Sequence, residues 1–82
     1  MNEQIRQILA EQAGLAVPVE TLGDDDDLFA AGLTSFGVVN VMLALEDALD
    51  VELPEHLLRK STFQSVSALA TALGGLAPTM AP

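Results

Sequence analysis

The chain has 82 residues, no cysteine and a formal net charge of -9 at pH 7. A chain of this length forms one domain that buries roughly 60% of its unfolded surface, so we expect no large catalytic cleft. The excess of acidic residues disfavours nucleic acid and anionic lipid as partners and favours proteins with basic surfaces. The lack of cysteine excludes disulfides and thiolate metal sites, so any thiol chemistry has to be imported.

The start of the chain mixes charged and apolar residues. Glu3, Arg6 and Glu11 stand among the apolar side chains, which is unlike the basic-then-apolar order of a signal peptide. We therefore expect a cytoplasmic protein. The uncharged run 28–45 is long enough to raise the question of a membrane span, but glycines and Asn40 interrupt it and acidic residues flank it. We expect no span.

The first segment, about residues 2–13, has its apolar residues at helical spacing. Asn2 is suited to cap the start of this helix and Gly14 to end it. The apolar positions are Ile5, Ile8 and Leu9.

A long connection follows, at about residues 15–33, with four consecutive aspartates at 24–27. A loop of this length is uncommon in a compact domain unless its own side chains pin it. The aspartates lack the spaced ligands, glycine and glutamate of an EF-hand, so we expect no metal site. We expect a solvated charge run that also steers basic partners toward Ser35. The expected apolar pins are Leu22, Leu28 and Phe29.

A second helix is predicted from Ser35 to about Leu49, with Thr34 as its N-cap. A hydroxyl on the first turn of a helix is exposed and lies next to free N–H groups and the positive end of the helix dipole. A phosphate is well tolerated there. Ser35 is therefore the main candidate for a functional residue.

The second helix has two distinct faces when it is wound at about 100° per residue. The expected core stripe is Val38, Val41, Met42, Leu45, Ala48 and Leu49. The opposite arc carries Ser35, Phe36, Val39, Asn40, Leu43, Glu46, Asp47 and Asp50. Apolar residues clustered beside a hydroxyl and rimmed by carboxylates indicate a docking surface. The alternative is that the long loop or another helix covers them.

Two further helices are predicted in the last third of the chain. A short one begins at Pro54, which suits a first helical position, and ends near Leu58. The last helix runs from Thr62, as its cap, to Leu73, and glycines end it. The class is therefore all-α, with three main helices and a short third helix. We expect the domain to span residues 1–75 and the tail 76–82 to be disordered.

With these motifs in view, the chain resembles the acyl carrier protein family over nearly the whole domain. The motifs are Asp27-Leu28-Phe29, Gly32-Leu33-Thr34-Ser35-Phe36 and Val41-Met42-Leu43-Ala44-Leu45-Glu46-Asp47. The resemblance implies a four-helix bundle, a monomer and a non-catalytic carrier. It also implies that a phosphopantetheinyl transferase moves 4′-phosphopantetheine from coenzyme A onto Ser35. The arm would hold an acyl group as a thioester and present it to a downstream acceptor enzyme.

The chain departs from the family pattern beside Ser35. Thr34 stands where the family has aspartate, and Gly37 and Asn40 are neutral where fatty-acid carriers are acidic. This variant looks like the stand-alone carriers that accept an amino acid from a ligase related to seryl-tRNA synthetases, while a fatty-acyl or polyketide cargo is the alternative. The expected partner-binding residues are Thr34, Phe36, Val39, Asn40, Leu43, Glu46 and Asp47.

The residues also bear on two other classes of function. A serine hydrolase needs a base, and the single histidine, His56, stands near the short helix without a G-x-S-x-G motif around Ser35. We expect His56 to be a surface residue. The rival from another class is an unmodified acidic helical adaptor that binds through Phe36, Val39 and Leu43.

Overall fold

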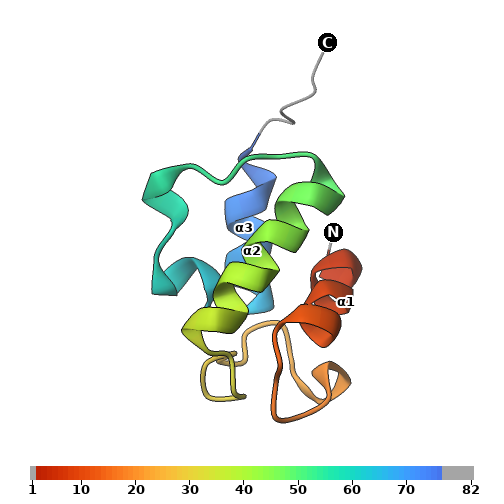
Figure 1. Cartoon of the computed structure of the whole chain (residues 1–82). Helices are drawn as coiled ribbons and strands as arrows, with labels where there is room; N and C mark the ends of the chain where they lie inside the picture. Colours follow the sequence, from red (N-terminus) through yellow and green to blue (C-terminus); the bar gives the residue numbers. More distant parts are fainter. Residues whose placement is uncertain (1, 77–82) are drawn as a thin grey trace.

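The computed structural model describes residues 2–76, which form three α-helices and three 3₁₀ turns and contain no strand. The α-helices are α1 (Asn2–Gln12), α2 (Ser35–Leu49) and α3 (Val66–Gly74), and the turns are η1 (Val19–Thr21), η2 (Glu55–Leu57) and η3 (Lys60–Phe63). Figure 1 shows the helices side by side, with the long loop crossing one end and η2 and η3 on one flank. The predicted all-α class is confirmed. The tail expected at 76–82 lies, from residue 77 on, outside the described residues.

The core fills the space that the three helices and the long loop enclose. Each helix contributes fully buried apolar side chains, and so do the loop and η3. The largest of these are Ile5, Leu9, Leu28, Val41, Leu45, Phe63, Val66 and Leu69. Because residues from every part of the chain meet there, the loop is a structural layer of the domain and not only a connection.

Helix α1 ends before Gly14, as predicted. Its start differs by one position, because a cap at Asn2 would make Glu3 the first helical residue. Asn2 is its first residue and not its cap, and the side-chain amide of Asn2 donates to Asp24 Oδ2 at 3.4 Å. The prediction missed this because the loop supplies the partner. Gly14 follows the helix with a φ of 66°, a left-handed conformation that glycine adopts without strain.

The predicted pins of the long loop are confirmed. Leu28 is fully buried, and the half-buried Leu22 and Phe29 pack against the core. Backbone hydrogen bonds add to them: Ala16 N donates to the carbonyl of Ala31 at 2.8 Å, and Leu28 N donates to that of Gln64 at 2.7 Å. The loop therefore holds its shape and is tied to the segment between η3 and α3.

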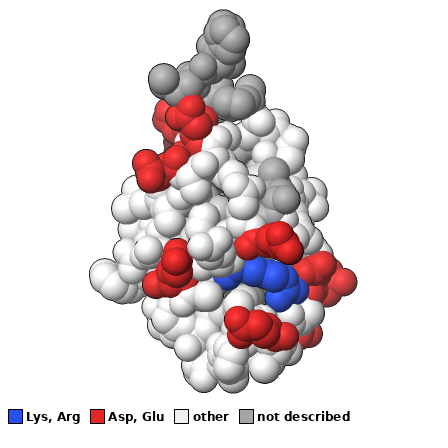
Figure 2. Space-filling view, turned by 90° about the vertical axis from the view of Figure 1, so that its right-hand side faces the viewer, with Lys and Arg blue, Asp and Glu red and all other residues white. Residues whose placement is uncertain are grey.

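Arg6 fastens the same loop to α1. Its Nη1 atom donates to the carbonyls of Val19 and Leu22 at 3.1 and 2.8 Å, and its Nη2 atom lies 2.6 Å from Asp24 Oδ1. Figure 2 shows the resulting pattern on the α1 face, where basic atoms lie among acidic ones. This cation is engaged within the fold.

The aspartate run is exposed, as expected, but it also shapes the loop. Asp26 Oδ2 accepts a hydrogen bond from Gly23 N at 2.7 Å. Asp27 Oδ1 accepts from Phe29 N at 2.9 Å and from Ala30 N at 3.3 Å. The carboxylates therefore satisfy backbone N–H groups that no helix would satisfy in this segment.

The last third of the chain differs from the prediction in two places. The short helix is a 3₁₀ turn with Pro54 as its N-cap, so Pro54 precedes the first helical residue. Thr62 does not cap the last helix: it is buried inside η3, and Ser65 caps α3 by accepting from Ala68 N at 3.0 Å. The burial of Phe63 explains this, because the η3 turn places that ring in the core before α3 begins.

The predicted core stripe of α2 is correct at its centre and wrong at its edges. Val41 and Leu45 are fully buried, whereas Val38, Met42 and Leu49 are half-buried and Ala48 is exposed. Helix α2 packs mainly on α1, so its flank toward η3 is only partly covered. A helical wheel gives the direction of the core but not the width of the face that neighbouring elements cover.

Candidate functional site

Ser35 lies on the first turn of α2, at the end of the molecule where the long loop passes (Figure 1). Thr34 is the N-cap, as predicted: its backbone is extended, and its Oγ1 atom accepts from Gly37 N at 3.1 Å. Ser35 itself is exposed. The hydroxyl that the sequence analysis singled out is therefore accessible and sits on a capped, rigid turn.

Two glycines fix the position of this turn. Gly32 has a φ of 113°, and a Cβ atom there would lie 2.8 Å from Ala16 N. Gly37 is buried, and a Cβ atom there would lie only 2.6 Å from the carbonyl oxygen of Ala13. In the sequence, Gly37 stands out only as an uncharged position. The structure shows that Gly37 lets the start of α2 approach the end of α1.

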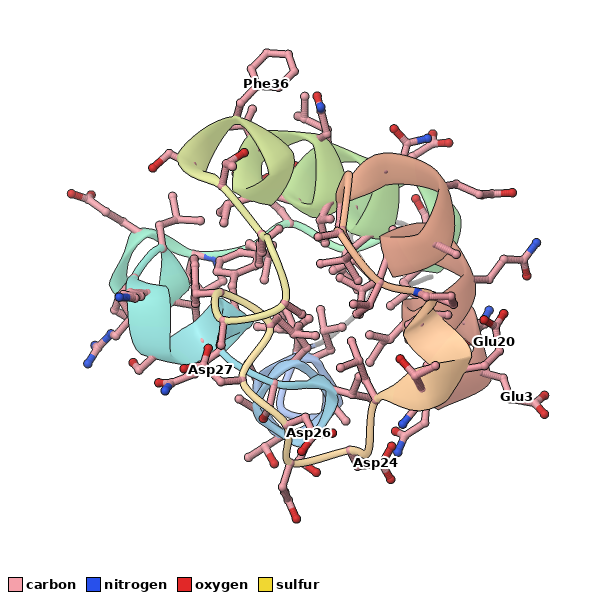
Figure 3. The ribbon with its side chains drawn as sticks, turned by 90° about the horizontal axis from the view of Figure 1, so that it is seen from below. Glu3, Glu20, Asp24, Asp26, Asp27 and Phe36 are labelled. Carbon is pink, nitrogen blue, oxygen red and sulfur yellow. The ribbon has the colours of Figure 1, made fainter. Side chains whose placement is uncertain are left out.

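The apolar residues of the predicted docking arc are exposed. Phe36, Val39 and Leu43 have 76%, 48% and 55% of their surface exposed, and Phe36 projects away from the bundle in Figure 3. Neither the loop nor another helix covers them, so the alternative interpretation is wrong. We call these three residues the α2 ridge.

The polar residues predicted to bind partners are less uniform. Thr34 and Asp47 are exposed, whereas Asn40 and Glu46 are half-buried. Glu46 also has an internal partner, because its Oε2 atom accepts a hydrogen bond from Leu53 N at 2.9 Å. Its carboxylate therefore holds the segment that follows α2, a contact beyond the end of the helix that helical spacing does not reveal.

A groove of about 630 Å³ lies beside Ser35, between α2 and the η2–η3 segment. Its apolar lining consists of Phe29, Leu33, Val38, Val39, Met42, Leu58 and Phe63. Its polar lining consists of Thr34, Ser35, Arg59 and Lys60, and no acidic residue is among them. This groove, and the place of Arg59 and Lys60 in it, were not predicted from the sequence. The signal available was that two of the three basic residues stand next to each other.

The acidic run lies away from the α2 ridge. Figure 3 shows Phe36 on one side of the molecule and Asp24 and Asp26 on the opposite side. The side chain of Asp24 is paired with Arg6. This placement does not favour the expectation that the run steers partners toward Ser35, because the two features face different directions.

Other kinds of site find no support in residues 2–76. No group of three potential metal ligands occurs in that range. None of its helices has both the length and the hydropathy that crossing a bilayer requires. His56 is exposed in η2, and its carbonyl accepts from Arg59 Nε at 2.9 Å. His56 does not line the groove that contains Ser35.

Comparison with known proteins agrees with this geometry. Residues 3–73 match the family model described as the phosphopantetheine attachment site. An aminoacyl carrier protein of Agrobacterium fabrum is 48% identical over 69 residues, which cover 84% of this chain and 83% of that protein.

Two solved structures extend the comparison. The first contains a carrier protein from Agrobacterium tumefaciens with AMP and an engineered glycine:carrier protein ligase from Bradyrhizobium japonicum. It matches with a TM-score of 0.87 and 44% identity, covering 90% of this chain and 99% of that chain. The second, a holo acyl carrier protein from Nitrosomonas europaea, matches with a TM-score of 0.78 and 29% identity and covers 89% and 90%. The chain therefore belongs to the acyl carrier protein family, whose covalent cofactor is 4′-phosphopantetheine.

Proposed function

We propose that Ser35 is the attachment site of 4′-phosphopantetheine and that the loaded arm carries an aminoacyl group. The observation that carries this proposal is the exposed Ser35 hydroxyl on the capped first turn of α2, within the matched range 3–73. A transferase can reach this oxygen without unfolding the domain. When bound, 4′-phosphopantetheine supplies the thiol that this cysteine-free chain lacks.

The residues around Ser35 fit such an arm. The groove offers an apolar floor next to Ser35, which suits the methyl and methylene groups of a pantetheine chain. Arg59 and Lys60 bring positive charge to the same groove, which suits the negative charge of a phosphodiester. The volume of about 630 Å³ lies within the range of roughly 300–1,000 Å³ that is usual for small-molecule sites.

In this proposal the chain acts by presentation and not by catalysis. Thr34 and Gly37 hold the first turn of α2, so the arm swings from a fixed point. The α2 ridge is free to meet the transferase, the loading ligase and the acceptor enzyme in turn. Weak docking of this kind permits fast exchange between partners, because weak complexes dissociate quickly. No histidine or carboxylate lines the groove with Ser35.

An aminoacyl cargo is favoured over a fatty-acyl or polyketide cargo by the comparisons. The Agrobacterium fabrum relative is an aminoacyl carrier protein, and the Agrobacterium tumefaciens carrier was crystallised with a glycine:carrier protein ligase. We therefore propose that a ligase of this kind loads the present chain with a small amino acid.

Stepwise mass spectrometry of the intact protein tests this function. The chain is incubated with coenzyme A and a broad-specificity phosphopantetheinyl transferase, and then with ATP, a glycine:carrier protein ligase and a panel of amino acids. We expect a gain of one phosphopantetheine and then of one aminoacyl group that hydroxylamine removes. Loading by acyl donors alone would favour the fatty-acyl or polyketide alternative. No first gain with any transferase would favour an unmodified adaptor.

A further inference from the structure

The chain has three lysine and arginine residues, and they lie at two places in the fold. Arg6 is engaged with the long loop through two carbonyls and Asp24. Arg59 and Lys60 line the groove that contains Ser35, whose lining holds no carboxylate. A chain with a formal net charge of -9 therefore has a local positive region beside the proposed attachment site.

The structure also holds these two cations in place. Arg59 Nε donates to the carbonyl of His56 at 2.9 Å, which orients the guanidinium on the η2–η3 segment. Lys60 Nζ lies 5.0 Å from the centroid of the Phe29 ring, a distance typical of a cation–π interaction. Phe63, three residues along the same turn, is buried in the core. The two side chains thus extend from an anchored turn.

We propose that Arg59 and Lys60 bind the phosphodiester that joins the arm to Ser35; this inference rests on the proposed function. A phosphodiester carries one negative charge at neutral pH. Guanidinium groups bind phosphate oxygens in a fork, and ammonium groups bind them as point charges. The pair neutralises the linkage on the groove side, where an acidic chain would otherwise repel it.

This contact sets the direction in which the arm leaves Ser35. The phosphate is drawn toward the η2–η3 side of α2, away from Phe36 and Leu43, which do not line the groove. These two residues of the α2 ridge then remain uncovered while the unbound carrier holds its arm, whereas Val39 also lines the groove. A partner can dock on Phe36 and Leu43 first and draw the arm out afterwards.

The test uses the phosphopantetheinylated protein and ³¹P NMR. The test variant is R59Q/K60Q, and the matched control is Q4E/Q12E, which makes the same change in net charge on exposed positions of α1. Intact mass first verifies the arm, and circular dichroism verifies the fold. Salt is then raised from about 10 mM to about 1 M, which shortens the Debye length from roughly 30 Å to roughly 3 Å.

We expect the phosphorus resonance of the native protein and of Q4E/Q12E to move with salt, because an exposed ion pair is screened. In R59Q/K60Q the resonance should begin near the high-salt position and stay there. The amide resonances of Phe29 and Lys60 should also differ between the unmodified and modified native protein, and this difference should vanish in R59Q/K60Q.

Four results would overturn the inference. A salt-independent phosphorus shift in the native protein, or equal behaviour of native protein and R59Q/K60Q, would remove the contact and leave the proposed function intact. Equal behaviour of both variants would show an effect of net charge alone. Absence of the arm from native protein would overturn the proposed function and this inference together, and the mass measurement distinguishes that case.

Discussion

Replacement of Gly37 by alanine should destabilise the domain, although the same change normally stabilises a helix. Alanine is favoured over glycine in a helix by about 1 kcal/mol. At Gly37 the added Cβ atom would lie 2.6 Å from the carbonyl oxygen of Ala13 and 3.1 Å from Leu33 Cδ1, whereas ordinary contacts begin at 3.4 Å. The start of α2 must therefore move away from α1 by most of an ångström.

The balance of these two effects sets the magnitude. Overpacking of this kind costs roughly 1–3 kcal/mol, and the upper part of that range applies because the obstacle is a backbone atom. After the helix gain is subtracted, we expect Gly37→Ala to lower the free energy of unfolding by about 1–2 kcal/mol. For a domain of this size that is a fall in Tm of roughly 10 °C.

The assay is thermal and urea unfolding followed by circular dichroism, with Gly74→Ala as the matched control. Gly74 ends α3, and a Cβ atom there would meet nothing within 4 Å. The control should therefore be neutral or slightly stabilising. If Gly37→Ala proves as stable as the native protein, the close approach of α2 to α1 is wrong, and with it our explanation of how Ser35 is positioned.

Three further predictions follow from the same structure. Phe36→Asp and Leu43→Asp should each lower kcat/KM for ligase loading roughly tenfold, because each removes an apolar anchor of the interface. The circular dichroism of both variants should be unchanged. A loss of helicity would instead indicate that these side chains belong to the core. Arg6→Met should lower the free energy of unfolding in urea by about 2 kcal/mol, mainly through the two carbonyl hydrogen bonds; an unchanged urea midpoint would show that the loop is held without it. Ser65→Ala should lower the free energy of unfolding by about 1 kcal/mol, because the N-cap of α3 is lost. An unchanged free energy of unfolding in urea would contradict the assignment of Ser65 as the cap and favour Thr62.

The parts of the fold that depend on neighbouring residues could be predicted from the sequence. The start of α2 is an example, because Thr34 caps a helix through Gly37, three residues along the chain. The stop at Gly14 is another, since a left-handed residue is a local requirement. The exposure of the α2 ridge also followed from helical spacing.

The parts that depend on distant residues could not be predicted. The cap of α3 is Ser65 and not the predicted Thr62, because Phe63 enters a core made largely by other segments. Glu46 was predicted to be a surface carboxylate that binds partners, but its carboxylate accepts a hydrogen bond from Leu53 N. Arg59 reaches the groove beside Ser35 only because the chain folds back through η2 and η3. Helical spacing does not contain this information.

The central claim is that the Ser35 hydroxyl is the attachment site of 4′-phosphopantetheine. Peptide-level mass spectrometry tests this claim most directly. After reaction with coenzyme A and a phosphopantetheinyl transferase, the protein is digested and the modified residue is located by fragmentation. We expect one arm, on Ser35, in the native protein and in Ser61→Ala, and none in Ser35→Ala that has kept its fold. An arm on another residue, or undiminished modification of Ser35→Ala, would contradict the account.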